Sequence, residues 1–113
     1  MIQVICPVCG AVLEPQGTAW RCVQGHCFDV ARQGYVNLLT VTQKHSRHPG
    51  DTREMVAARR AFLDAGWYAP IAKTLADLVR RFCPEAASVL DAGCGEGYYL
   101  SQLGWVPERW GID

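Results

Sequence analysis

The chain has 113 residues, with 11 basic and 11 acidic side chains, a formal net charge of zero and a hydrophobic fraction of 50%. This length allows one domain or two small ones, and the composition is typical of a soluble globular protein. No apolar run reaches the ~20 residues that cross a bilayer, and no basic segment followed by an apolar core opens the chain. We therefore expect a cytoplasmic protein with no membrane partner.

Charge is distributed unevenly along the chain. Residues 21–60 carry seven basic and three acidic side chains, whereas residues 61–113 carry four basic and seven acidic ones. A basic segment is a candidate surface for a polyanion such as RNA. A segment charge of this size is also common on an ordinary solvated face, so charge alone leaves both interpretations open.

The N-terminal segment carries metal ligands at the spacing of a structural zinc site. A C-x-x-C knuckle is followed by a C-x-x-x-H sequence. Two such knuckles surround a tetrahedral ion, and a closed set of four ligands leaves no open position for catalysis. Metal binding would supply folding free energy that so small a module cannot obtain from apolar burial. The expected Zn²⁺ ligands are Cys6, Cys9, Cys22 and His26.

Alternatives to this metal site remain open. Cys27 is adjacent to His26 and could replace it as the fourth ligand. The same cysteines could form disulfides, which a cytoplasmic setting disfavours, or a redox site, which would require a strand and a helix around the knuckle. The zinc-binding module is expected to occupy residues 1–42. The apolar residues Tyr35, Val36, Leu38 and Leu39 predict a short strand that packs on it.

A polar loop over residues 42–51 follows, with Pro49-Gly50 as a turn signal. Its sequence T-Q-K-H-S-R-H-P-G-D clusters basic and histidine side chains that could contact RNA phosphates. A solvated linker between two modules explains this composition equally well. Together with the first predicted helix, the segment supplies four candidate RNA contacts: Lys44, Arg47, Arg59 and Arg60.

Two helices are predicted after the loop. The first begins after Asp51 or Thr52 as N-cap and runs to about Ala65, with Gly66 as its stop. The second has Pro70 in its first turn and runs to about residue 82. Apolar residues at helical spacing predict one buried face on each helix. These faces comprise Met55, Ala58, Phe62 and Ala65 on the first helix, and Ile71, Leu75, Leu78, Val79 and Phe82 on the second.

The C-terminal part is organised around residues 89–100, V-L-D-A-G-C-G-E-G-Y-Y-L. A buried strand is expected to end at Asp91, and a short helix over residues 98–103 follows a glycine turn. Glycine suits this turn because it adopts positive φ cheaply and lets a ligand approach the backbone. The alternating glycines of the turn are Gly93, Gly95 and Gly97.

The pattern D-x-G-x-G-x-G differs from the dinucleotide-binding fingerprint, in which the third glycine comes one residue later. It resembles the first motif of Rossmann-like S-adenosylmethionine-dependent methyltransferases, with Asp91 and Gly93 as cofactor contacts. A second strand over residues 110–113 ends at Asp113, 20 residues after Gly93. Such folds place a carboxylate for ribose hydroxyls at about this spacing. The alternatives are a glycine-rich turn of another α/β protein and an exposed terminal Asp.

These segments predict an α/β fold in three parts. A zinc-ribbon-like module covers residues 1–42, a basic linker with two helices covers 43–84, and the start of a Rossmann-like methyltransferase domain covers 85–113. Two strands can be placed after Ser88, whereas a doubly wound sheet has about five or more. We therefore expect an N-terminal part of a longer enzyme that is inactive by itself.

Taken together, the motifs resemble one family, the bacterial large-subunit ribosomal RNA guanine-N1 methyltransferases. The shared segments follow one order along nearly the whole chain: C-P-x-C from Cys6, C-x-x-x-H from Cys22, F-D-V-A from Phe28, G-Y-V-N-L-L from Gly34, K-H-S-R-H-P-G-D from Lys44, A-R-R-A-F-L-D-A-G from Ala58 and V-L-D-A-G-C-G-E-G-Y-Y from Val89. This order is more specific than the knuckles or the glycine loop alone.

The resemblance implies a function. Family members use S-adenosylmethionine to methylate N1 of a guanine in a hairpin of large-subunit ribosomal RNA, hold RNA with an N-terminal zinc module and act as dimers. Relatives that modify a nearby guanine confer macrolide resistance, notably to tylosin. The resemblance places the zinc ligands at the four positions named above and cofactor contacts at Tyr68, Gly95 and Glu96. Cys27 and the absent later half of the catalytic domain depart from the family pattern.

Two other functions remain open. A zinc ribbon that binds RNA or protein could carry a vestigial, inactive methyltransferase start. A methyltransferase of the same fold could also act on a small molecule or a protein, although the zinc module and the basic segment disfavour this. Cofactor binding over residues 91–97 distinguishes an enzyme from a binding module.

Overall fold

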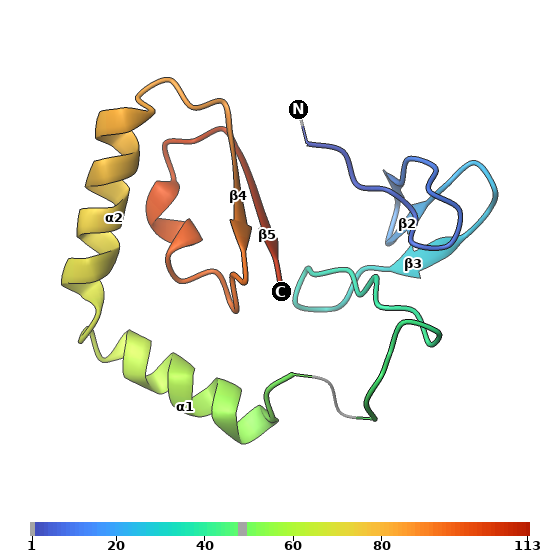
Figure 1. The fold of residues 1–113 in the computed structure, drawn as a ribbon, viewed down its shortest axis with the longest axis horizontal. Coiled ribbons are helices and arrows are strands. Elements are labelled where there is room, and N and C mark those ends of the chain that lie inside the picture. The colour runs from blue at the N-terminus through green and yellow to red at the C-terminus, as the bar shows by residue number, and fades with distance from the viewer. Residues whose placement is uncertain (1, 48–49) are drawn as a thin grey trace. The chain divides into compact units, whose positions relative to one another are not determined.

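The computed structural model describes residues 2–47 and 50–113 (Figure 1). By its contacts the chain divides into two compact units, residues 2–50 and residues 51–113. The first unit contains three short strands, and the second contains two helices, two strands and a 3₁₀ helix. His48, and Pro49 of the turn expected at Pro49-Gly50, lie outside the described ranges. No helix in the described ranges has the length and apolarity needed to span a membrane.

The first unit is built on a three-stranded antiparallel sheet. Its strands are β1 (Glu14–Gln16), β2 (Ala19–Arg21) and β3 (Cys27–Asp29), in the order β1-β2-β3. A two-residue turn joins β1 to β2, and Gly17 adopts a φ of +64° there, which explains a glycine at that position. The small core contains the buried residues Cys6, Leu13 and Cys22, with Trp20, Phe28 and Leu38 packed against it.

The strand expected over residues 35–39 does not form. Val36 makes one isolated antiparallel bridge with Val30, and the residues that follow are irregular. Tyr35 is exposed, whereas Leu38 packs against the small core. A short apolar run predicts burial better than it predicts strand pairing. A strand also needs a neighbouring strand with which the whole run can form backbone hydrogen bonds.

In the second unit, helix α1 (Arg53–Asp64) begins and ends where the sequence predicts. Thr52 is the N-cap, and its hydroxyl oxygen accepts a hydrogen bond from the Met55 N–H at 3.2 Å. Gly66 follows the C-cap with a φ of +87°, which favours glycine. The predicted buried face is wrong, because none of the α1 side chains, all of them described, is buried.

Helix α2 (Ala69–Phe82) has Pro70 in its first turn, as predicted. The face that it buries is only partly the predicted one, because Val79 is half-buried but the other four predicted residues are exposed. Ala72 is 2% exposed, whereas Leu75 is 42% and Phe82 71% exposed. Helix α2 contacts the 3₁₀ helix η1 (Leu100–Leu103). Ala72, Ala76 and Val79 are its buried and half-buried residues and share one side of the helix.

Strands β4 (Ser88–Ala92) and β5 (Glu108–Ile112) pair in parallel. Their connection contains the glycine loop and η1, which replaces the helix expected over residues 98–103 by a single short 3₁₀ turn. Leu103 and Val106 of this connection are buried. Figure 1 shows η1 between α2 and the two strands, in agreement with its contacts to both α2 and β5.

Candidate functional site

The first candidate site is the cysteine and histidine cluster. The ligand atoms of Cys6, Cys9, Cys22 and His26 all lie within 4.8 Å of one another. The Cys22 Sγ atom is 3.3 Å from His26 Nδ1, Cys6 Sγ is 3.7 Å from the same nitrogen, and the Sγ atoms of Cys9 and Cys22 are 3.7 Å apart. Zn–S bonds of about 2.3 Å and tetrahedral angles require ligand separations of about 3.8 Å. The donor set and these separations suit Zn²⁺.

Backbone hydrogen bonds shape the two knuckles. In the first, the Gly10 N–H donates to the Cys6 carbonyl at 2.8 Å. In the second, the Gly25 N–H donates to the Cys22 carbonyl at 3.0 Å, and the Cys22 N–H donates to the His26 carbonyl at 3.1 Å. Gly10 and Gly25 both have positive φ, so the tight turns that present the ligands depend on glycine.

The cluster favours the thiolate form of one ligand. Burial raises the pKa of the Cys22 thiol, but hydrogen bonds from the backbone of His26 and Gln24 and from the side chains of Cys9 and His26 lower that pKa to about 6. Thiolate is the form that binds a metal. Cys27 lies in β3, opposite Arg21, and is not among the clustered ligands. Of the two candidates for the fourth ligand, the structure brings His26 to the cluster.

The second candidate site is the loop after β4, here called the glycine loop (residues 93–97). Gly93, Gly95 and Gly97 all have positive φ, so each alternating glycine meets a backbone requirement. The Gly93 and Cys94 N–H groups donate to the Ile112 carbonyl at 2.7 and 3.0 Å. These bonds attach the start of the glycine loop to the end of β5.

The two candidate carboxylates flank the glycine loop. Asp91 pairs with Gly111 across the strands, and Asp113 follows Ile112 at the end of β5. Burial, together with the negative charges of Asp91 and Asp113, raises the pKa of the Cys94 thiol. Parallel pairing therefore brings two carboxylates, 22 positions apart in the sequence, to the same edge of the sheet. Open α/β sheets bind ligands at this edge.

The glycine loop is also tied to helix α1. Both Glu96 carboxylate oxygens accept hydrogen bonds from the Arg60 guanidinium, with Arg60 Nε 2.7 Å from Glu96 Oε2. These bonds lower the pKa of Glu96 below its ordinary value. Arg59, the neighbouring basic residue, forms an ion pair with Asp51 at 2.6 Å. Two predicted RNA contacts are thus engaged with carboxylates of this unit.

The remaining predicted residues lie apart from these two clusters. The Tyr68 ring packs edge-on against Phe62 of α1, with a centroid separation of 4.9 Å. No hydrogen bond or ring contact joins Tyr68 to the glycine loop within the described residues. Lys44 and Arg47 are exposed in the first unit, where the Lys44 N–H bonds back to the Thr40 carbonyl at 3.0 Å.

Sequence reasoning missed Gly111 as a contributor to this site. A Cβ atom at that position would lie 2.6 Å from Cys94 Sγ and 3.4 Å from a methyl carbon of Leu100. Gly111 thus lets the glycine loop and the residues after it pack directly on β5. A glycine inside a predicted strand often marks such a close approach, and this signal was present in the sequence.

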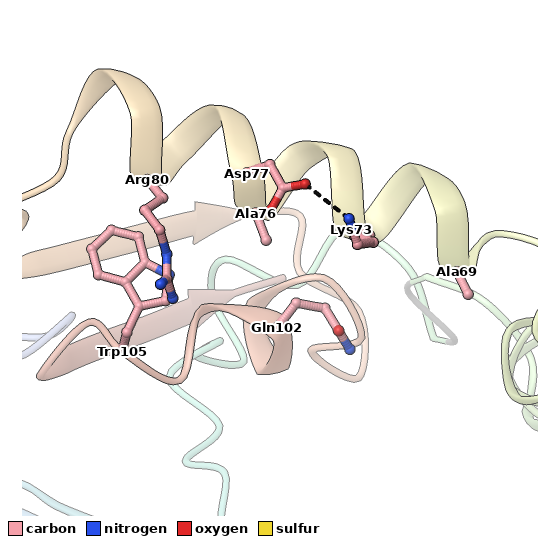
Figure 2. A pocket seen from close by; sticks show the side chains of 7 residues that line it. All are labelled: Ala69, Lys73, Ala76, Asp77, Arg80, Gln102 and Trp105. Carbon is pink, nitrogen blue, oxygen red and sulfur yellow. Dashed lines mark hydrogen bonds and ion pairs between the residues drawn. The ribbon is translucent and has the colours of Figure 1, made fainter.

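The described surface of the second unit includes a smaller and a larger hollow. One, of about 290 Å³, is lined by Gly97, Leu100, Ser101 and Arg109 and adjoins the last glycine of the glycine loop. The larger, of about 480 Å³, lies along α2. Figure 2 shows Arg80 stacked over the Trp105 indole at one end of it and the Lys73–Asp77 ion pair beside it. None of the predicted site residues lines the larger hollow.

Comparisons with known proteins relate both sites to one family. Residues 4–47 match a family model described as the RlmA N-terminal zinc ribbon. The chain is 46% identical to the 23S rRNA (guanine(748)-N(1))-methyltransferase of Streptomyces fradiae, a match that covers 87% of this chain and 35% of that protein. It is 42% identical to a Micromonospora griseorubida protein provisionally named a 23S rRNA (guanine-N(1)-)-methyltransferase, covering 95% of this chain and 42% of that protein.

A third relative, from Bacillus subtilis, carries the same provisional name. It is 35% identical to this chain, and the match covers 87% of the chain and 35% of that protein. The chain therefore spans between about a third and two fifths of the length of these relatives. By these matches residues 4–47 resemble the N-terminal zinc ribbon of RlmA, and most of the chain is similar to part of proteins named 23S rRNA guanine-N1 methyltransferases.

Proposed function

We propose that this chain forms the zinc module and the cofactor-binding start of an enzyme that transfers a methyl group from S-adenosylmethionine to N1 of a guanine in 23S ribosomal RNA. The observation that carries the proposal is 46% identity, over 87% of this chain, to a protein named for that reaction. Because the chain spans 35% of that relative, the activity is proposed for the whole protein, which we expect to act as a homodimer in the cytoplasm.

The proposed cofactor site lies at the carboxyl ends of β4 and β5. The donors and acceptors suit the ligand, because carboxylates accept hydrogen bonds from ribose hydroxyls and from an ammonium group. A Cβ atom at Gly93, Gly95 or Gly97 would meet no other atom within 4 Å, so the backbone of the glycine loop is open to a ligand. The residues proposed to hold the cofactor are Tyr68, Asp91, Gly93, Gly95, Glu96 and Asp113.

The first unit is proposed to hold RNA. A Zn²⁺ ion bound by Cys6, Cys9, Cys22 and His26 would fix the fold of the module and take no part in catalysis, because its four positions are filled by protein. Lys44 and Arg47 are the proposed phosphate contacts, since Arg59 and Arg60 already bind carboxylates. Phosphate contacts attract RNA without reading its sequence, so they position the hairpin.

The methyl-transfer reaction depends mainly on the alignment of its two reacting groups. The bound cofactor supplies a methyl group that its sulfonium already makes electrophilic. The protein must therefore hold N1 of the guanine in line with that group, which is an orientation effect. The N1 proton has to leave to a base or to water, and the guanine has to be unstacked from the hairpin to reach the site. The residues of this chain contribute binding and orientation to that reaction.

Calorimetric titration of S-adenosylmethionine into the purified chain, with zinc content measured on the same sample, tests the cofactor site. We expect binding in the wild type and its loss in Asp91→Ala. Asp77→Ala is the matched control, because Asp77 is an exposed carboxylate on α2 that pairs with Lys73 away from the glycine loop. A folded, zinc-loaded chain that does not bind the cofactor would contradict the proposal and favour a non-catalytic RNA- or protein-binding module.

Binding of a 23S hairpin RNA at several salt concentrations tests the RNA surface. Each lost phosphate contact lowers the slope of log affinity against log salt by about 0.7 to 0.9. We expect this reduction in Lys44→Ala and in Arg47→Ala. Arg32→Ala, which removes an exposed basic residue of the same unit, is the control. Equal slopes in all four proteins would exclude Lys44 and Arg47 as phosphate contacts.

A further inference from the structure

An ion pair joins helix α1 to the glycine loop. Arg60 and Glu96 are 36 positions apart, and their two hydrogen bonds join both carboxylate oxygens to the guanidinium. This two-point geometry fixes the plane and direction of the carboxylate, which a single contact would not do. The side chains are 58% and 45% exposed, so the pair adds little to global stability. Its main consequence is the position of Glu96.

The part of the glycine loop that carries Glu96 needs such a restraint. The loop is attached at its start by the Gly93 and Cys94 N–H groups and at its end by the bond from the Gly97 N–H to the Cys94 carbonyl. Between these attachments lie Gly95, with positive φ, and Glu96. A glycine on each side gives this peptide more conformational freedom than other residues would. The Glu96 side chain is held from outside the loop by α1.

We propose that Arg60 is a positioning residue for the cofactor site: its guanidinium holds the Glu96 carboxylate, and with it the Gly95–Gly97 turn, in the conformation that receives S-adenosylmethionine. The inference rests on the proposed function, and it assigns to Arg60 a role in the cofactor site in place of RNA contact. Each Glu96 oxygen keeps lone-pair capacity for a ligand while it accepts one hydrogen bond from Arg60.

The pairing also has a pH consequence. Hydrogen bonds from Arg60 lower the pKa of Glu96, and the same carboxylate raises the pKa of Arg60, to which Asp64 of α1 adds a smaller effect. A carboxyl group with a lowered pKa keeps its charge, and hence the pair, until the pH falls through that lowered value. Without Arg60 the carboxylate protonates at its ordinary, higher pH, so cofactor binding should weaken earlier during acidification.

The test is calorimetric affinity for S-adenosylmethionine between pH 4 and 8 in four proteins. We expect Arg60→Ala to bind about tenfold more weakly at pH 7, equivalent to about 1.4 kcal/mol, and to lose further affinity at a higher pH than the wild type. Arg60→Lys should recover part of the affinity, because Lys keeps the charge and loses the two-point geometry. Arg59→Ala, whose ion pair is with Asp51, should match the wild type.

Two further proteins, Glu96→Ala and the double variant, separate positioning from a direct effect. If Arg60 acts through Glu96, then Arg60→Ala combined with Glu96→Ala should bind no more weakly than Glu96→Ala alone. Far-UV circular dichroism of each variant checks that α1 is retained. If the wild type binds the cofactor and Arg60→Ala binds it with the same affinity and pH profile, this inference is overturned and the proposed function stands. Absence of binding in the wild type would overturn both.

Discussion

Cys94 of the glycine loop lies so close to Gly111 of β5 that a Cβ atom on Gly111 would be 2.6 Å from the Cys94 sulfur. The carbonyl of the next residue, Ile112, accepts the two hydrogen bonds that attach the glycine loop to β5. The end of β5 therefore serves as the base on which the proposed cofactor loop is built. Any side chain added there should displace the loop.

The first prediction concerns this contact. Gly111→Ala should lower the free energy of unfolding by about 1 to 3 kcal/mol, the usual range for overpacking a close contact, and should weaken cofactor binding. Urea unfolding measures the first effect and calorimetry the second. Adding Cys94→Ala removes the sulfur and should recover part of the stability. If Gly111→Ala is as stable as the wild type, the close contact between Gly111 and Cys94 does not constrain the glycine loop.

The second prediction concerns the fourth zinc ligand. Cys27→Ser should retain one Zn²⁺ per chain, because Cys27 lies outside the ligand cluster. His26→Ala should reduce zinc affinity by more than about tenfold, since losing even an outer-shell partner costs that much. Competition with a chromophoric chelator measures both affinities. The reverse pattern, with zinc lost in Cys27→Ser and kept in His26→Ala, would show that Cys27 is the ligand.

Metal removal should unfold the first unit selectively. Two of the three residues in its small buried core, Cys6 and Cys22, are also proposed ligands, and the third is Leu13. A chelator should therefore collapse the dispersed amide signals of residues 2–47 into the narrow range of an unfolded chain in a two-dimensional nuclear magnetic resonance spectrum. The helical signals of α1 and α2 should remain. Persistence of the dispersed ribbon signals without metal would contradict a folding role for zinc.

The third prediction uses Cys94 to report on the proposed cofactor carboxylates. Burial and the charges of Asp91 and Asp113 raise its pKa, so Cys94 should react slowly with iodoacetamide at neutral pH. Asp91→Asn or Asp113→Asn removes a negative charge that disfavours the thiolate. Each change should lower the Cys94 pKa and shift its alkylation profile to lower pH.

Peptide mass spectrometry across pH measures these rates, with the exposed Cys83 as an internal reference. The rate at Cys83 should stay constant in both variants. An unchanged Cys94 profile in both Asn variants would mean that neither carboxylate acts on the glycine loop in solution.

The fourth prediction distinguishes the two faces of α2. Ala72 is the buried residue of α2, and α2 contacts η1, so Ala72→Leu should destabilise the unit by about 1 to 3 kcal/mol. Leu75 is exposed, so Leu75→Lys should change stability by no more than about 0.5 kcal/mol. Urea unfolding compares the two. A larger loss in Leu75→Lys would mean that the apolar stripe is covered in solution.

Local chemistry allowed much of this protein to be predicted from its sequence. The ligand spacing of the zinc module, the Thr52 N-cap and Gly66 stop of α1, and the three glycines of the loop after β4 each depend on a few neighbouring residues. Short-range backbone geometry decides such features, and the structure confirms the helix ends and the positive φ of the glycines. Local turns form each knuckle, whereas the assembly of the two knuckles into one cluster brings together ligands 13 and 20 positions apart in the sequence.

The tertiary structure decided which residues from distant segments of the chain contact one another. Helical periodicity marked an apolar stripe on α2 but could not tell which face meets η1, because burial depends on which surfaces are present to cover it. Parallel pairing brought Asp91 and Asp113 to one edge, and packing set Gly111 against Cys94. The Arg60–Glu96 pair joins residues whose separation of 36 positions carries no periodic signal. These relationships arise from chain geometry over long distances, so only the folded structure could decide them.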